Sequence, residues 1–133
     1  MLRPVGLLLC LLLLLPAGCS ENGLVEVTGR VTLDDKPLEK GTVSFVPADG
    51  KGPSAAAIIE QGAYSVEVAP GAKKVEILGY KSMGKRRYDE NDPSSPMLDI
   101  NQQIVPERFN AKTELTCEVG PAARQHDFAV QSQ

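Results

Sequence analysis

Four side chains in this sequence are of the types that most often carry covalent or metal chemistry: Cys10, Cys19, Cys117 and His126. A transition-metal site needs several cysteine or histidine ligands close together, and the sequence offers no second histidine and no closely spaced cysteine pair. It also lacks a CxxC pair, an HExxH motif and a glycine-rich phosphate loop. We therefore expect no metal, no cofactor and no catalytic group in this chain.

Cys117 and His126 lie in stretches where apolar and polar residues alternate. Cys117 stands between Leu115 and Val119 on the apolar parity, where a free cysteine acts as a small buried hydrophobe with an inert thiol. His126 has the parity of Phe128, so we expect it at the rim of the core with a local hydrogen-bond partner. A redox-sensing thiol and a metal-ligating histidine are the alternatives.

Cys19 follows a segment with the layout of an export signal. Arg3 supplies a positive charge, the run from Val5 to Leu15 is apolar, and Pro16 and small residues follow it. At about 1.5 Å per helical residue the run would cover only about half of a ~30 Å hydrocarbon core, which is short for a transmembrane helix. Residues 1–18 are therefore predicted to be a cleaved signal peptide.

The residues before Cys19 resemble the lipobox of bacterial lipoproteins, in which a leucine, two small residues and a cysteine direct lipid onto the thiol. Ala17, Gly18 and Cys19 match this pattern, whereas Pro16 stands where leucine is usual and Leu15 lies one place earlier. The resemblance implies lipidation of Cys19 and a membrane anchor of two or more acyl chains, which is durable. It implies a lipoprotein of the cell envelope, at the outer membrane or the periplasmic face. Ordinary secretion is the alternative.

The mature chain is long enough for one domain. Removal of residues 1–18 leaves 115 of the 133 residues, with a tether over 19–24 and a domain over 25–133. The formal net charge is −3, and it becomes −4 when Arg3 is removed with the signal. An acidic domain without a basic stripe is a poor candidate for binding nucleic acid. With Cys19 capped by lipid, Cys117 has no partner for an intrachain disulfide.

Most of the domain reads as short strands. Alternating or apolar stretches bounded by turn residues cover 25–33, 41–47, 55–60, 63–69, 73–80, 113–119 and 126–131. Gly29 lies on the apolar parity, which indicates a bulge or close contact with a neighbouring element. Gln61-Gly62 predicts a two-residue hairpin. Seven strands without a helical period predict an all-β, seven-stranded antiparallel β-sandwich.

Residues 81–112 show no strand pattern and are expected to form a long loop. A basic cluster in this loop is followed directly by Asp89, Glu90 and Asp92. Three interpretations stay open: a solvated loop kept soluble by its charges, a calcium site built from these hard oxygen ligands, and a recognition loop on a rigid scaffold. The residues of the recognition loop would be Tyr80, Lys85, Arg86, Arg87 and Tyr88.

Three longer stretches, VTGRVTLDDKPLEKGTVSFVPADG, GAYSVEVAPGAKKVEI and IVPERFNAKTELTCEV, carry a family resemblance. They resemble the carboxypeptidase regulatory-like, transthyretin-like domains of short lipoproteins, particularly those of planctomycete-type bacteria. The resemblance covers nearly all of the mature chain and implies a prealbumin-like sandwich with no known chemistry. Pro106, Phe109 and Asn110 match the family's corner motif, with phenylalanine in place of the commoner tyrosine, and are expected to be architectural.

The transthyretin-related fold also includes hydrolases of 5-hydroxyisourate, whose site needs two histidines, an arginine and a YRGS-like carboxyl terminus. This chain has only His126 and ends in FAVQSQ, so an enzyme of that type is not expected. We expect a lipid-anchored, non-catalytic interaction or structural module with a protein or cell-wall partner. The alternative is a small carbohydrate-binding module, for which Tyr80 and Tyr88 are the candidate aromatic platform.

Overall fold

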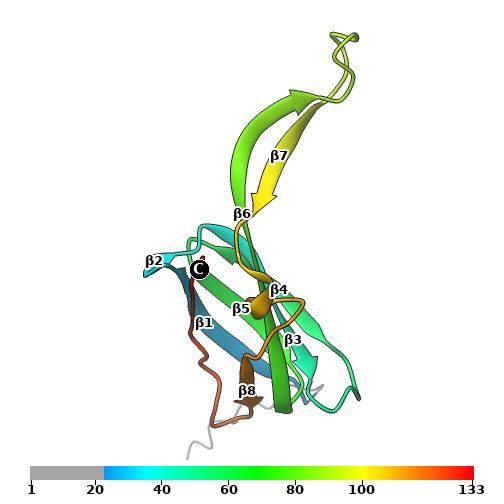
Figure 1. Cartoon of the computed structure of the whole chain (residues 1–133). Helices are drawn as coiled ribbons and strands as arrows, with labels where there is room; N and C mark the ends of the chain where they lie inside the picture. Colours follow the sequence, from blue (N-terminus) through cyan, green and yellow to red (C-terminus); the bar gives the residue numbers. More distant parts are fainter. Residues whose placement is uncertain (1–22) are drawn as a thin grey trace, which may run out of the picture.

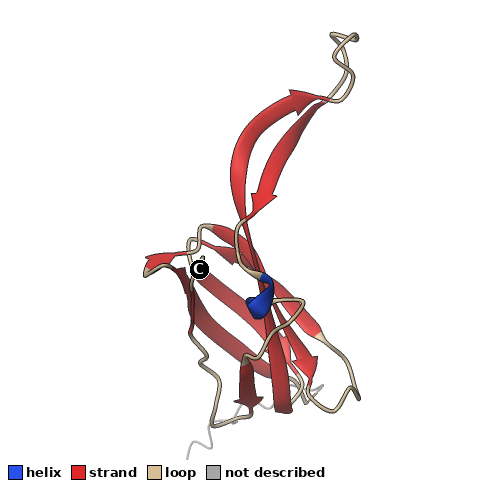
Figure 2. Cartoon of the chain, in the orientation of Figure 1, coloured by secondary structure: helices blue, strands red, loops and turns tan. Residues whose placement is uncertain are grey.

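The computed structural model describes residues 23–133, which form an all-β fold (Figure 1). The strands are β1 (Val25–Leu33), β2 (Lys36–Pro37), β3 (Lys40–Pro47), β4 (Ala55–Glu60), β5 (Ala63–Val68), β6 (Gly71–Arg87), β7 (Met97–Gln103), β8 (Thr116–Val119) and β9 (Phe128–Val130). A single turn of 3-10 helix, η1 (Glu107–Phe109), stands out in Figure 2. No helix in the described part of the chain has the length and apolarity that crossing a membrane requires.

The strands form one curled sheet in the order β2-β1-β5-β4-β3-β6-β7, with β8 paired to β6 and β9 paired to β1. The β3–β4 and β3–β6 ladders are long, but β4 and β5 share only the pair Glu60↔Ala63. The sheet therefore turns over at this hairpin. As a result, Phe45 on β3 lies near Tyr64 on β5 and Phe128 on β9, with ring centroids 6.0 and 6.4 Å apart respectively.

The core lies inside the curl, and the alternation of the sequence builds it. Its fully buried side chains come from the apolar parity of β1, β3, β4, β5, β6, β8 and β9: Phe45, Ile59, Ile77, Val27, Val31, Val43, Val68, Val75, Val119 and Val130. Leu33, Val66, Leu115, Cys117 and Phe128 are partly buried against them. Polar neighbours on the other parity, such as Glu26 and Glu67, are exposed.

Two local predictions are confirmed. Gln61 and Gly62 have φ of 51° and 79° and connect β4 to β5 as a two-residue hairpin. A Cβ atom on Gly29 would lie 1.8 Å from the carbonyl oxygen of His126, so this position does contact a neighbouring segment of the chain. That segment continues into β9, which pairs with β1 in parallel rather than in the antiparallel sense expected of every strand.

Two predictions are wrong. The described residues form nine strands, not seven, because β2 and β7 show no recognisable alternation. Residues 81–112 are not a long loop: they contain the second half of β6, all of β7 and η1. All seven residues of β7 are exposed, so neither face of this strand needs an apolar pattern. The predicted signal peptide, Cys19 and most of the 19–24 tether lie outside the described residues.

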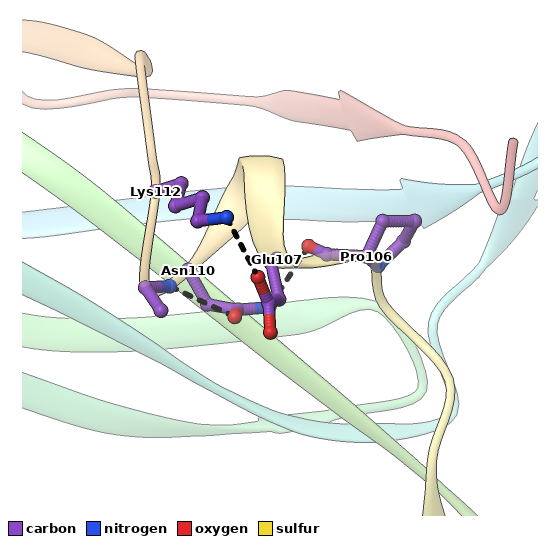
Figure 3. A network of polar contacts seen from close by, with 5 residues as sticks. Pro106, Glu107, Asn110 and Lys112 are labelled. Atoms are coloured by element: carbon purple, nitrogen blue, oxygen red, sulfur yellow. Dashed lines mark hydrogen bonds and ion pairs between the residues drawn. The ribbon is translucent and has the colours of Figure 1, made fainter.

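The corner after β7 is held by Asn110, which is 7% exposed. Its Nδ2 atom donates to the carbonyl oxygens of Ile77 and Val105 at 3.2 Å and of Pro106 at 3.0 Å. An ion pair of 3.4 Å joins Lys112 to Glu107 beside η1 (Figure 3). The architectural role predicted for the corner is confirmed, and it fixes where the chain leaves β7 and returns to the body.

Candidate functional site

The second half of β6 and all of β7 form a two-stranded arm, residues 80–103, that projects from the body of the sheet (Figure 1). Pairing of β6 with β3 ends at Gly41↔Gly79, and from Tyr80 onward β6 pairs with β7 instead. The amide of Ile104 donates to the carbonyl of Gly79 at 2.9 Å and closes the base of the arm. The arm therefore continues a core strand into solvent, and the core fixes its direction.

A β-bulge bends the arm at Met83 and Gly84. Ser82 pairs with Asn101 and Lys85 pairs with Asp99, so two residues of β6 stand opposite the single residue Ile100. Gly84 has φ of 101°, a conformation that side chains disfavour, and nothing lies within 4 Å of a Cβ built there. Glycine is therefore required at this position by backbone conformation and not by crowding.

The two faces of the arm differ in chemistry. Leu98 and Ile100 are two residues apart on β7, so their side chains lie on the same face. Ser82 is paired with Asn101, which lies on the opposite face, and the next residue, Met83, therefore lies on the face of Leu98 and Ile100. We call this the apolar face. All three side chains are exposed, at 42%, 39% and 56% respectively. Lys81, Arg86 and Gln102 border these side chains on the same face. The opposite face carries one exposed apolar side chain, Met97, and is otherwise polar or charged: Tyr80, Ser82, Lys85, Arg87, Asp99, Asn101 and Gln103.

Only part of the predicted basic cluster is free to meet a ligand. Lys85 forms an ion pair of 3.6 Å with Asp99, and the Arg87 guanidinium donates to the carbonyl oxygens of Pro93 and Ser95 in the tip. Arg86 shares the apolar face with Lys81, and neither makes an ion pair or side-chain hydrogen bond within residues 23–133. Lys85 and Arg87 therefore order the arm, whereas Lys81 and Arg86 leave their charges available.

The tip, residues 88–96, is an ordered acidic turn. The hydroxyl of Ser95 accepts the amide of Asp89 at 2.8 Å, and the Asp89 carboxylate accepts the amide of Asn91 at 2.9 Å. Hydrogen bonds from Ser94 lower the pKa of the exposed Asp92 carboxyl. Across the described residues, no three histidine, cysteine, aspartate or glutamate side chains come together in a geometry that would hold a metal ion. The carboxylates of Asp89 and Asp92 instead accept hydrogen bonds from amides and a hydroxyl of their own turn.

The two tyrosines of the candidate platform lie at opposite ends of the arm. Tyr80 is at the base, whereas Tyr88 follows the end of β6 and is 74% exposed. Eight residues of extended chain separate them by roughly 25 Å. They therefore cannot contact the same sugar ring, although the rest of the predicted recognition set, Lys85, Arg86 and Arg87, does lie between them on one strand.

Tyr80 lines two depressions at the base of the arm. One has a volume of about 480 Å³ and includes Ile58, an isoleucine that is 68% exposed. The other has a volume of about 270 Å³, and its lining residues are Leu33, Lys36, Pro37, Leu38, Glu39, Tyr80, Lys81 and Ile104. The second depression is mainly apolar and lies where β7 joins the body.

Cys117 and His126 take structural positions. Burial raises the pKa of the Cys117 thiol, the neighbouring Glu118 adds to the rise, and Lys73 opposite it in the ladder only partly offsets them. A thiol with a raised pKa is a poor nucleophile at neutral pH. The His126 ring nitrogen Nε2 lies 3.0 Å from the carbonyl oxygen of Ala123. This local partner at a half-buried position is what the sequence predicted.

Sequence reasoning missed Met83, Leu98 and Ile100 as surface residues of interest. The spacing of Leu98 and Ile100 is a short fragment of strand alternation, and a glycine in Met83-Gly84 is a typical bulge signal. Both signals were present in the sequence. They were too short to stand out, because no buried face repeats them along the strand.

Comparison with known proteins gives no family. No protein-family model matches the chain, and no curated protein matches it. Among solved structures, a candidate adhesin from Bacteroides ovatus is similar with a TM-score of 0.47 and 16% identity, over 88% of this chain and 49% of that one. A 9R-lipoxygenase from Cyanothece is similar with a TM-score of 0.39 and 14% identity, over 83% of this chain and 16% of that one. The chain thus spans less than half of either structure.

Proposed function

We propose that this protein is a lipid-anchored, non-catalytic module of the cell envelope whose β6–β7 arm is its recognition surface. The observation that carries the proposal is the apolar face: Met83, Leu98 and Ile100 are exposed together on an arm that an extended core strand holds away from the body. Exposed apolar side chains gathered on one surface are typical of sites that bind another macromolecule.

The placement of the arm suits a protein that is anchored at its amino terminus. Val25, the first residue of β1, pairs with Val68 just before the start of β6, whereas the arm extends from the other end of β6. A lipid on Cys19 and a tether over 19–24 would hold the body by the end opposite the arm. The tip would then point away from the anchoring membrane, toward a protein or cell-wall partner and not toward the lipid.

We further infer a prealbumin-like sandwich and membership of the transthyretin-like lipoprotein domains. Supporting this are the single β4–β5 ladder pair at which the sheet turns over and the facing of Phe45 with Tyr64 and Phe128. The non-catalytic assignment rests on the missing catalytic motifs of the sequence, as does the expectation that nucleic acid is not a partner.

The recognition role is tested by site-specific photocross-linking of the full chain in cells. A photoreactive residue at position 100 on the arm is compared with one at position 58, an exposed isoleucine on the body. We expect protein cross-links at position 100 and few at position 58, and we expect the substitutions Met83→Ser and Leu98→Ser to reduce the yield. Equal yields at the two positions would contradict the proposal.

The anchor is tested separately. Cys19→Ala should abolish incorporation of labelled fatty acid and release the protein from the membrane fraction. If the wild-type chain carries no label, and Cys19→Ala still sediments with membranes, the lipoprotein assignment is wrong.

A carbohydrate-binding module is the second candidate, and the depression next to Tyr80 and Ile58 favours it. An aromatic ring beside a shallow depression is the usual arrangement for stacking a sugar. Because Tyr80 and Tyr88 are far apart, glycan binding should be lost in Tyr80→Ala and kept in Tyr88→Ala. Binding to a glycan array with this pattern would favour the carbohydrate reading over a protein partner.

A further inference from the structure

The outer edge of β7 is an unprotected strand edge. Within residues 23–133, β7 pairs only with β6 and ends the sheet. Strand edges are normally protected from pairing with other chains by lysine, proline or a bulge. β7 carries none of these, and its one charge, Asp99, already faces Lys85. The bulge of the arm lies on β6, so the β7 backbone is regular and able to add another strand.

We propose that β7 pairs with β7 of a second copy of this chain, antiparallel and centred on Ile100. This inference rests on the proposed role of the arm as a recognition surface and names its partner. With Ile100 opposite Ile100, Leu98 lies opposite Gln102 and Asp99 opposite Asn101, so no like charges meet. Centring the pair on Asp99 would place two aspartates directly opposite each other, which is unfavourable.

The charges on β6 favour pairing through the β7 edge over stacking of two apolar faces. Face-to-face stacking would bring Lys81 and Arg86 of one copy against the same cations of the other. In a β6-β7-β7-β6 sheet the two β6 strands are three strand spacings apart, roughly 14 Å. This separation exceeds the Debye length of about 8 Å at physiological salt, so repulsion between the cations is largely screened.

Antiparallel pairing also brings each tip to the base of the other arm. Met97, where the tip returns to β7, would lie opposite Gln103 of the second copy, and the tip would continue past Ile104. There lies the apolar depression of about 270 Å³ that includes Lys36 and Lys81. Its lining offers two cations against the single carboxylate of Glu39.

The tip has the complementary chemistry. It carries the highly exposed ring of Tyr88 and the carboxylates of Asp89, Glu90 and Asp92. In the dimer, the ring of Tyr88 would enter the apolar depression of the other copy, and the acidic residues of the tip would lie beside its lysines. This contact would form twice, because a two-fold interface uses the same surface on both copies. Charge complementarity of this kind predicts that association weakens as salt is raised.

The register is tested by cross-linking introduced cysteines in the full chain, with Cys117→Ser as the background. Under the proposed anchor Cys10 is removed with the signal and Cys19 is blocked by lipid, and the Cys117→Ser chain without an introduced cysteine measures any dimer that Cys19 gives. Ile100→Cys should give a covalent dimer with a short bifunctional thiol reagent, because residues directly opposite each other have Cβ atoms about 5 Å apart. The matched control is Ser82→Cys, an exposed residue of the same arm that lies on β6, one strand farther from the seam. Equal dimer yields from the two variants would overturn the register.

Association itself is tested by co-purifying two differently tagged full-length copies from the same cells. Ile100→Lys places a charge at the seam without touching the core, and we expect it to reduce co-purification at least about tenfold. Ala56→Lys, at an exposed position of β4 that lines neither depression at the base of the arm, should keep it. Unchanged melting temperatures would show that both variants fold. Co-purification that survives Ile100→Lys overturns the inference.

The two proposals fail differently. If photocross-links from position 100 reach another protein and never a second copy, the arm is a recognition surface but self-pairing is wrong. If position 100 gives no cross-links at all, both proposals are wrong. A homodimer cross-link from position 100, together with co-purification that is lost in Ile100→Lys and weakened by high salt, supports both.

Discussion

Replacing Gly29 with alanine should loosen the carboxyl-terminal segment from β1. The added Cβ would lie 1.8 Å from the carbonyl oxygen of His126, 2.7 Å from its carbonyl carbon and 2.8 Å from the Tyr64 hydroxyl. Two of these three atoms are backbone, so a side-chain rotation cannot relieve the contact. The segment that contains His126 must move away from β1.

Three of the hydrogen bonds that hold that segment lie directly at the contact and set the magnitude. The amide of Thr28 donates to the carbonyl oxygen of Arg124 at 2.9 Å, and the amide of His126 donates to the carbonyl oxygen of Thr28 at 3.0 Å. The Tyr64 hydroxyl donates to the carbonyl oxygen of His126 at 2.5 Å. At about 1 kcal/mol for each bond, their loss costs about 3 kcal/mol, which is at the upper end of the usual cost of overpacking. For a domain of this size that corresponds to a fall of roughly 10 to 15 °C in melting temperature.

Thermal unfolding followed by circular dichroism measures the effect. Gly120→Ala is the matched control, because nothing lies within 4 Å of a Cβ at Gly120 and its φ is not positive. We expect Gly120→Ala to melt within a few degrees of the wild-type protein. The close-contact argument would be refuted if Gly29→Ala had the same melting temperature as Gly120→Ala, whether both stayed near the wild-type value or both fell by the same amount.

Three further predictions concern the corner, the thiol and the carboxyl terminus. Asn110→Ala should lower the free energy of unfolding by about 2 to 3 kcal/mol in urea titration, because buried carbonyls lose their donor; Asn110→Asp should cost more at pH 7, since its carboxylate would face those oxygens. Cys117 should resist iodoacetamide at pH 7. Its thiol pKa is raised above the ordinary 9.0, so the thiol ionises at lower pH in the unfolded chain than in the folded one. The free energy of unfolding should therefore fall as pH rises above about 9, and less steeply in Cys117→Ala. Identical slopes of the free energy against pH in the two proteins would contradict this. Hydrogen bonds from Ser132 lower the pKa of the Asp34 carboxyl, so their stabilisation is present above 3.8 and lost as pH falls through the lower folded value. Amide exchange at Ser132 should therefore accelerate only at strongly acid pH, and Asp34→Asn should remove that transition.

Strands whose two faces differ could be predicted from the sequence. The alternation of Val25, Val27 and Val31 with polar residues predicts which side chains of β1 are buried, because one face meets the core and the other meets water. The hairpin at Gln61-Gly62 was equally predictable, since its conformation depends on two adjacent residues. The sequence predicted a bulge or a close contact at Gly29, but it did not predict that the contacting group is the backbone of His126.

The arm could not be predicted, because both of its faces are in solvent. Without a buried face, no repeating apolar pattern marks β7, and the bulge at Gly84 shifts the parity of β6 midway along the arm. The sequence therefore predicts one uniform basic cluster over Lys85, Arg86 and Arg87. Only the pairing register separates Arg86, on the apolar face, from Lys85 and Arg87, which are bound within the arm.

The sequence by itself determined that this chain is all-β, which residues of the body strands form the core, and that Asn110 marks a corner. These features depend on local alternation and turn chemistry, which neighbouring residues encode. Tertiary structure alone decided that β9 joins β1 in parallel, that β6 extends beyond the body, and that Met83, Leu98 and Ile100 share one exposed face. These features depend on pairing between segments that are distant in the sequence. Backbone hydrogen bonds and register decide which strands pair and which residues share a face, and the side-chain pattern does not.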